Sequence, residues 1–386
     1  MGQVKDAYLE AQERGWDAPD TFACARCVED EYLKSLLAAT AARRRCDYCG
    51  RRSAKPIAAP TQVLVAAIFD AVHRYYCEPA AGGVPYDKGY LVEAMPFSDV
   101  LEALGFEAQP ELYDAVIGSE VNGDYFVPAA DGYWAGSHDH NVWSSGWSQF
   151  AHTVKHETRF HFAHVPASPV DSPFELDVRR ALPTIAERLR LLIRAVPAGT
   201  RVYRARIRKR RQTWLPDASQ MGAPPPDKAG AGRMNPAGIP YLYASFEAAT
   251  ARREIGVVGR TSHTVFTAEF ALDAPLTVID LAQLPDVPSL FDVDHKAERE
   301  QALFIRQFVD TISVPVVKDG REHIDYVPSQ VVCEYLAQVF VVGHGRALDG
   351  LIFPSSVRTG GQNLVVFPDR DTHSFRGVSF VRAGRR

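Results

Sequence analysis

Four cysteines most constrain how the first part of this chain can fold. Cys24 and Cys27 form one pair, and Cys46 and Cys49 form a second, in the pattern C-x2-C-x18-C-x2-C. This spacing is typical of a structural zinc site, because each two-residue gap lets both thiolates of a pair face one ion. Four cysteine ligands leave no open position for water, so we expect the Zn²⁺ to be structural rather than catalytic. Free or disulfide-linked cysteines are the alternative, although a cytoplasmic chain would not keep disulfides.

Five arginines crowd the second cysteine pair: Arg43, Arg44, Arg45, Arg51 and Arg52. Such a cluster would suit phosphates, which makes a non-catalytic, zinc-dependent nucleic-acid-binding protein one hypothesis. The other is a solvated basic face on a module that packs against its own chain. The formal net charge of −4 favours the solvated basic face, because the protein as a whole does not carry the excess of positive charge typical of nucleic-acid-binding proteins.

Composition places the 386 residues among ordinary globular proteins. The 46% hydrophobic and 23% charged residues exclude a mainly disordered, collagenous or coiled-coil chain. The charged N-terminal segment is not followed by the apolar stretch of a secretory signal, and no apolar run approaches the ~18 residues of a membrane span. We therefore expect a cytoplasmic protein with no membrane partner.

The predicted secondary structure of the chain changes near Gly199. Helical patterns are expected before it at 30–42, 61–76, 98–105 (with Ser98 as N-cap), 110–121 and 145–160, with a loop at 122–142. Short β-type runs follow it, alternating with helices at 247–257, 298–312 and 328–338. We predict an α+β fold in four parts: a four-cysteine zinc-binding module (1–55), a helical domain (56–170), a helical connector interrupted by Pro183 (171–197) and a mixed α+β domain (198–386).

Five short motifs follow one another in the last half. They are Y-R-A-R at 203–206, G-R-M-N-P-A-G at 232–238, Y-L-Y at 241–243 with Glu254 eleven residues on, D-Y-V-P-S-Q at 325–330 and D-G-L-I-F-P-S-S at 349–356. In this order and spacing, about residues 198–372 resemble the RES domain, named for its Arg, Glu and Ser residues. The N-terminal half resembles the zinc-containing, HEPN-like region that precedes some RES domains, through C-D-Y-C-G at 46–50 and the segment 147–162.

This resemblance implies a fold, a substrate and a set of site residues. RES domains resemble ADP-ribosyltransferases in fold and act on NAD, as toxins that deplete it or attach ADP-ribose to a target. The family's site residues fall, in chain order, on Arg204, Arg233, Tyr243, Glu254 and Ser355. Ser356 is adjacent, so the serine assignment stays open between these two positions.

The chemistry of NAD cleavage suits these residue types. Breaking the nicotinamide–ribose bond passes through an oxocarbenium-like state, which the Glu254 carboxylate would stabilise while holding the ribose hydroxyl. Arg204 and Arg233 would clamp the pyrophosphate, Tyr243 would stack on the cationic nicotinamide ring, and Ser355 would hydrogen-bond to the nicotinamide or ribose. Each residue also has an ordinary alternative, such as a surface charge for Arg204 or core packing for Tyr243.

The sequence thus favours an NAD-consuming enzyme, an NAD glycohydrolase or phosphorylase that serves as a bacterial toxin or defence protein. The first alternative is an ADP-ribosyltransferase with a protein or nucleic-acid acceptor, and a weaker one is an RES-like fold that binds NAD-type ligands without turnover. An antitoxin or other regulatory protein is the expected partner besides NAD. An HEPN ribonuclease is disfavoured, because those enzymes use an Arg followed four to six residues later by His, whereas Arg159 and His161 are two apart.

Overall fold

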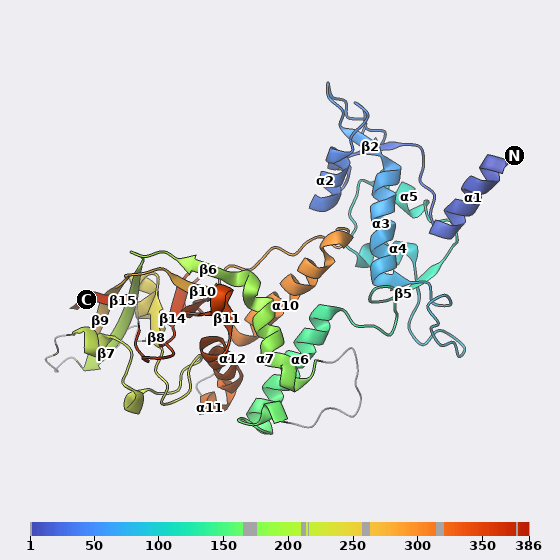
Figure 1. Ribbon diagram of the computed structural model, residues 1–386. Coiled ribbons are helices and arrows are strands. Elements are labelled where there is room, and N and C mark those ends of the chain that lie inside the picture. The colour runs from blue at the N-terminus through green and yellow to red at the C-terminus, as the bar shows by residue number, and fades with distance from the viewer. Residues whose placement is uncertain are drawn as a thin grey trace. The chain divides into compact units, whose positions relative to one another are not determined.

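The computed structural model describes residues 2–164, 176–209, 214, 216–256, 263–313, 320–375 and 377–385 (Figure 1). Its contacts divide the chain into two compact units. Unit 1 contains Met1–Asp139 and Val287–Glu300, and unit 2 contains His140–Asp286 and Gln301–Arg386. A helical N-terminal region followed by a large mixed sheet confirms the predicted α+β class. The four domain boundaries of the sequence analysis stay predictions.

Unit 1 is built around one buried helix, α3 (Thr61–Tyr75). Its apolar side chains, including Leu64, Ile68 and Phe69, are almost fully removed from solvent. The other α-helices that begin in this unit before residue 139 are α1 (Gly2–Arg14), α2 (Glu31–Ala39), α4 (Phe97–Ala103) and α5 (Pro110–Ile117). Strands β1 (Phe22–Cys24) and β2 (Ala58–Pro60) pair with each other, and a three-stranded sheet has the order β3 (Tyr76–Cys77), β5 (Tyr125–Pro128), β4 (Met95–Pro96).

Two local expectations in this region are wrong. Ser98 does not cap a helix: α4 begins at Phe97 after Pro96, and the Ser98 hydroxyl donates to Asp99 instead. The stretch 122–142 is not all loop, because it contains β5 and the start of α6 (Asp139–His156). Buried Phe126 and Val127 explain β5, since both faces of the strand are covered at these positions while its backbone pairs with strands on both sides. The polar residues flanking this short run hide it in the sequence.

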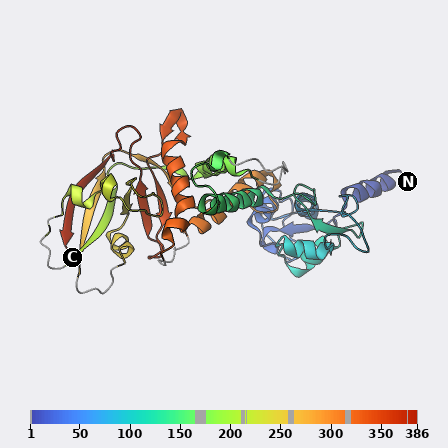
Figure 2. The same ribbon diagram turned by 90° about the horizontal axis from the view of Figure 1, so that it is seen from below.

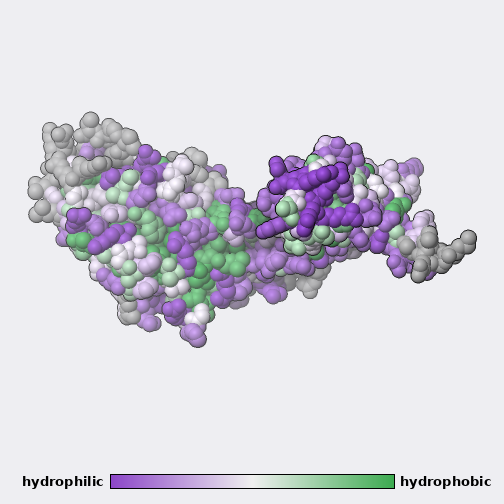
Figure 3. Space-filling view, turned by 90° about the horizontal axis from the view of Figure 1, so that it is seen from above, coloured by the Kyte–Doolittle hydropathy of each residue, from purple (hydrophilic) through white to green (hydrophobic). Residues whose placement is uncertain are grey.

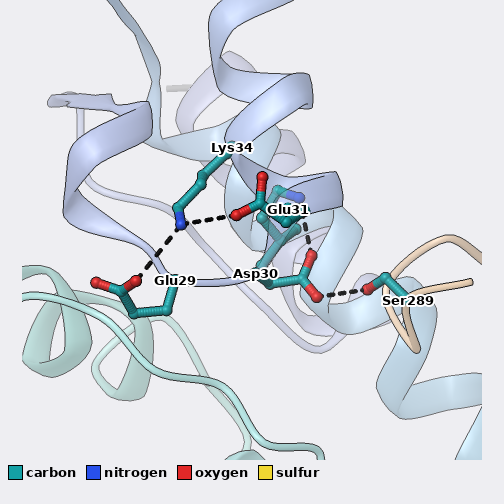
Figure 4. A network of polar contacts seen from close by, with 6 residues as sticks. Glu29, Asp30, Glu31, Lys34 and Ser289 are labelled. Carbon is teal, nitrogen blue, oxygen red and sulfur yellow. Dashed lines mark hydrogen bonds and ion pairs between the residues drawn. The ribbon is translucent and has the colours of Figure 1, made fainter. Parts of the chain in front are cut away.

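A distant segment of the chain, residues 287–300, completes unit 1. Phe291 is 2% exposed and meets the ring of Phe106 edge-on, with 6.1 Å between the centroids. Ser289 donates a 2.8 Å hydrogen bond to the Asp30 carboxylate, which also accepts from the backbone N–H of Leu33 and so caps α2 (Figure 4). One carboxylate therefore fixes both the start of α2 and the incoming segment.

We predict that Phe291→Ala lowers the free energy of unfolding of unit 1 by about 3–5 kcal/mol, because a large buried ring is lost and a cavity remains. Leu91→Ala is the control, because Leu91 is 71% exposed, and it should shift stability by less than about 0.5 kcal/mol. Urea unfolding followed by circular dichroism measures both. Equal midpoints for the two variants would show that the segment does not contribute to the core.

Unit 2 is organised by an eight-stranded sheet in the order β15-β9-β7-β8-β14-β13-β10-β6. Neighbouring strands are antiparallel except β10 and β13, which are parallel. The strands are β6 (Ile193–Val196), β7 (Arg201–Lys209), β8 (Leu242–Ser245), β9 (His263–Leu272), β10 (Leu276–Asp280), β13 (Gly350–Pro354), β14 (Gln362–Val366) and β15 (Val378–Arg385). A separate pair joins β11 (Val341–Val342) to β12 (Arg346–Ala347).

Helices cover one face of this sheet (Figure 2). They are α6, α7 (Val178–Arg188), the part of α10 (Lys296–Ser313) from Gln301 on, and α12 (Val327–Gln338). Trp147, Phe304 and Phe308 form the centre of that core. The opposite face carries a smaller core around Val202, Phe270 and the short helix α8 (Ala218–Met221). Helix α9 (Ala248–Glu254) contacts β7, β8, β9 and β14, and α11 (Glu322–Asp325) precedes α12.

Two expectations for the predicted helical connector (171–197) are wrong: that Pro183 interrupts its helix and that its last residues are helical. Pro183 lies inside α7 without ending it, whereas residues 193–196 form β6, an edge strand antiparallel to β10. A tight 3₁₀ turn at Leu189–Leu192 redirects the chain, and the open edge of β10 then supplies hydrogen-bond partners for the backbone. Among the described ranges, no helix combines the length and the apolarity needed to cross a membrane.

Candidate functional site

A pocket opens in unit 2 where β7 and β8 part. The two strands pair at one position only, Tyr203 with Ser245, while β7 stays paired with β9 as far as Lys209. The gap that follows holds a cavity of about 240 Å³. Its walls come from β7, β8, α9, β13 and β14, and consist of Tyr203, Arg204, Ala205, Tyr243, Ala244, Ser245, Ala251, Glu254, Ile255, Phe353 and Asn363.

Glu254 brings a carboxylate to this pocket from the last residue of α9. Its Oε1 accepts two hydrogen bonds of 2.7 Å, one from the Ser355 hydroxyl and one from the Asn363 side-chain amide. Asn363 is itself fixed, because its Oδ1 accepts a 2.6 Å bond from the Ser245 hydroxyl. The second carboxylate oxygen has no hydrogen bond to any described residue, so it is free to meet a ligand.

The loop after Ser355 holds α9 in place. The backbone N–H of Ser355 donates to the carbonyl of Gly361 and closes the loop, and Arg358 donates to the Thr250 hydroxyl at 2.8 Å. Gly361 is required by this close approach, because a Cβ there would lie 2.9 Å from Thr250 Oγ1. The carboxylate of Glu254 is therefore positioned by the packing of its helix as well as by direct hydrogen bonds.

Tyr243 is fixed by the loop 229–239. Its hydroxyl donates to Asn235 Oδ1 at 2.8 Å and accepts from the backbone N–H of Met234 at 3.1 Å. A Cβ at Gly232 would lie 2.7 Å from this hydroxyl, so the loop can pass only with glycine there. Burial raises the pKa of Tyr243 well above its ordinary value, and the phenol stays neutral at physiological pH.

Arg204 brings a cation to the same pocket. The side chain is half-buried, and its Nη1 atom is shielded from solvent without a hydrogen-bond partner among the described residues. Burial, with a smaller contribution from Arg206, lowers the pKa of Arg204 to about 10, so the guanidinium remains charged near pH 7. A buried charged donor without a partner is unfavourable by itself and favours binding of an anion.

Of Arg233, Ser355 and Ser356, only Ser355 contacts a residue that lines the pocket through a side-chain hydrogen bond between described residues. Arg233 lies outside the residues that line the pocket and donates to the carbonyls of Ile312 and Ser313, where α10 ends. Ser355 contacts Glu254, whereas Ser356 is exposed. The structure thus brings Arg204, Tyr243, Glu254 and Ser355 together and leaves Arg233 at a helix end.

Asn363 and Ser245 are site residues that the sequence analysis missed. Both belong to short apolar strands and pair across β14 and β8. Their signal is weak but readable: each is a buried polar residue next to apolar residues of a short strand. Such residues need a hydrogen-bond partner, and here the partners are each other and Glu254.

We predict opposite outcomes for removing two neighbouring hydroxyls. Tyr243→Phe leaves the buried Asn235 Oδ1 unpaired and should lower the free energy of unfolding by about 1–3 kcal/mol. Tyr241→Phe is the matched control, because the Tyr241 hydroxyl is buried without a hydrogen-bond partner among the described residues, so its loss should be neutral or stabilising. Urea titration of both variants measures the difference, and a larger loss for Tyr241→Phe would contradict the hydrogen bonding described.

Unit 1 contains a second candidate site, the four cysteines of the predicted zinc module. Their sulfurs all lie within 4.8 Å of one another, with 3.8 Å between Cys24 and Cys27 and 3.6 Å for both Cys24–Cys49 and Cys27–Cys46. A tetrahedral ion with bonds of about 2.3 Å spaces its sulfurs about 3.8 Å apart, so the cluster fits Zn²⁺. The cysteines are free, which excludes the disulfide alternative.

The thiols of this cluster differ in acidity. Burial raises the pKa of Cys27 and of Cys24. Burial acts in the same direction on Cys49, but the backbone N–H of Arg51 and the neighbouring thiols outweigh it and lower the pKa of Cys49 to about 7. A bound cation would favour the thiolate form of every one of them.

The fold and the site together define a class. A mixed sheet that parts around a small pocket, with a carboxylate, a cation and a fixed tyrosine at its walls, is a candidate site for a small ligand. Comparison with known families makes this specific: residues 201–383 match the RES domain, and residues 39–168 match HEPN/RES N-terminal domain 1. The two matches confirm the resemblance to an RES domain preceded by an HEPN-like region that the sequence motifs predict.

Other comparisons add little. One similar solved structure is the crystal structure of the M. tuberculosis MbcT–MbcA toxin–antitoxin complex. The matched chain is 13% identical, with a TM-score of 0.30, and the match covers 52% of this chain and 91% of that one. No curated protein matches the chain. The RES family supports a protein that acts on NAD, without distinguishing the reaction.

Proposed function

We propose that this protein cleaves the bond between nicotinamide and ribose in NAD. The observation that carries the proposal is the Glu254 carboxylate, which two hydrogen bonds hold through one oxygen while the other has no partner among the described residues. A carboxylate fixed in this way stabilises positive charge that develops on a sugar ring. Together with the RES family, it favours glycosidic chemistry over simple ligand binding.

The size of the pocket and the residues that line it indicate which half of NAD it would hold. A cavity of about 240 Å³ lies below the range of roughly 300–1,000 Å³ of pockets that enclose a whole drug-sized ligand. We therefore assign it to the nicotinamide–ribose end, with the ring against Tyr243 and the ribose against Glu254. The Arg204 guanidinium would meet the nearest phosphate, which supplies the anion that this buried charge lacks.

The reaction balances without a general acid for the leaving group. The bond between ribose C1′ and the pyridinium nitrogen breaks, and its electron pair neutralises the nicotinamide ring. Glu254 stabilises the resulting oxocarbenium-like ribose through its charge, and Ser355 and Asn363 keep the carboxylate in place. An acceptor oxygen then bonds to C1′ and releases its proton to solvent.

The acceptor decides which enzyme this is. Water gives a glycohydrolase, phosphate gives a phosphorylase, and a hydroxyl or carboxylate of a macromolecule gives an ADP-ribosyltransferase. We propose a glycohydrolase or a phosphorylase, since the contacts described in the site support cleavage of the bond and none of them identifies a macromolecular acceptor. Depletion of NAD suits a toxin or defence protein, and an antitoxin partner stays a prediction from the family resemblance.

We expect Glu254→Gln to lower the rate of nicotinamide release at least about 100-fold with little change in stability, because the substitution removes the charge and keeps the shape. The assay incubates the purified protein with NAD, with and without phosphate, and separates nicotinamide and the ribose product by chromatography. Free ADP-ribose indicates hydrolysis, and ADP-ribose with a phosphate on that same C1′ indicates phosphorolysis.

The matched control for this variant is Glu334→Gln, which neutralises an exposed carboxylate on α12. It should cleave NAD at the wild-type rate. Equal rates for Glu254→Gln and wild type would refute the proposed role of Glu254, and no nicotinamide release by wild type, with or without phosphate, would refute constitutive NAD cleavage.

We also propose that Cys24, Cys27, Cys46 and Cys49 hold one structural Zn²⁺. Cys27→Ser should lose the metal, measured by elemental analysis, and should lower the thermal midpoint of unit 1, because Cys27 is buried and central to the cluster. Cys77→Ser is the control, because Cys77 lies outside the cluster, and it should retain one Zn²⁺ per chain. Wild type without zinc after preparation in zinc-containing medium would contradict the proposal.

A further inference from the structure

The ribbon of residues 43–58 next to the cysteine cluster presents an unusual concentration of positive charge. Residues 43–55 contain five arginines and one lysine against the single acid Asp47, in a chain whose net charge is −4. All six basic side chains are exposed. Among the described residues none of the six forms an ion pair, and one of them, Arg43, stacks its guanidinium over the Phe22 ring at 3.8 Å.

The backbone arranges these side chains in a fixed pattern. Arg45 and Arg52 lie opposite each other across an antiparallel bridge, and Arg43 lies opposite Ala58. Further hydrogen bonds join Ser53 N to Arg44 O and Cys46 N to Arg51 O. Residues directly opposite in an antiparallel pair share one face, so Arg45 and Arg52 form a side-by-side cationic pair.

The cysteine cluster does not neutralise the positive charge of this ribbon. Four thiolates with one Zn²⁺ would leave two negative charges, fewer than the six basic side chains. Asp47, the nearest acid in sequence, already accepts a 2.9 Å hydrogen bond from the backbone N–H of Phe22. The excess charge faces solvent, and Figure 3 shows a dense hydrophilic patch on the side of unit 1 where this ribbon lies.

We propose that residues 43–55 form a docking surface for the phosphate backbone of a nucleic acid. Exposed arginines without ion-pair partners among the described residues are suited to phosphates, because the planar guanidinium can donate two hydrogen bonds to one phosphate and loses less side-chain entropy per hydrogen bond than a lysine does. Because contacts to phosphates carry no sequence information, we expect binding to depend on charge and shape rather than on sequence. The surface lies on unit 1, and the proposal does not depend on NAD cleavage in unit 2.

The test measures binding of the full-length zinc-loaded protein to fluorescein-labelled 30-mers of single-stranded RNA, single-stranded DNA and duplex DNA by anisotropy, between about 50 and 200 mM salt. We expect wild type to bind at least one of these probes with strong salt dependence. Comparing the three shows which nucleic acid supplies the phosphates. No binding to any of them at the lowest salt concentration would overturn the proposal.

The variant Arg45→Gln/Arg52→Gln should weaken binding at least about tenfold at about 100 mM salt and lower the slope of log affinity against log salt by about two, because two phosphate contacts are lost. The matched control, Lys88→Gln/Arg346→Gln, removes two exposed cations outside the ribbon and should bind as wild type does. An equal loss of affinity in the two double variants would show that only net charge matters, and it would overturn the assignment of the binding surface to residues 43–55. Zinc content verifies the fold, and Arg44→Gln/Arg51→Gln provides a second variant should the first lose its metal.

Discussion

The candidate site depends on one missing pairing, the separation of β7 from β8 beyond Tyr203 and Ser245. Each strand keeps its other neighbour, β9 for β7 and β14 for β8, so the sheet stays continuous while a gap opens within it. Two strand edges inside a sheet are costly unless something covers or uses their polar groups. Here α9 borders the gap, the loop 229–239 holds the Tyr243 side chain at its wall, and what remains open is the pocket.

The same gap explains why charged groups gather there. Glu254 stands at the C-terminal end of α9, where the helix dipole is unfavourable for a negative charge. Two hydrogen bonds to Oε1 offset that cost. Arg204 likewise keeps its charge although burial disfavours it. Proteins tolerate such local conflicts mainly at functional sites, because a ligand can resolve them.

The sequence predicts this site in part, and the limit has a physical origin. Arg204, Tyr243 and Glu254 were readable because motifs in a fixed order carry them, and the alternation of short apolar runs predicted most of the strands that bring them together. Asn363 cannot be recognised in this way. Its partner Glu254 is 109 residues away, and only the fold brings the two side chains within 2.7 Å. Strands β6 and β15 are hard to recognise in the sequence for a related reason, since edge strands take their pairing from a distant neighbour rather than from their own pattern.

Segment 287–300 shows that sequence families and folding units need not coincide. It lies within the RES match of residues 201–383, yet Phe291 belongs to the core of unit 1 and Ser289 binds the Asp30 carboxylate that caps α2. A fragment ending before the RES match would expose Phe106 and leave that carboxylate with one fewer donor. The N-terminal half should therefore be less stable alone than in the whole chain, since a buried aromatic contributes several kcal/mol and a domain has only about 5–15 kcal/mol in total.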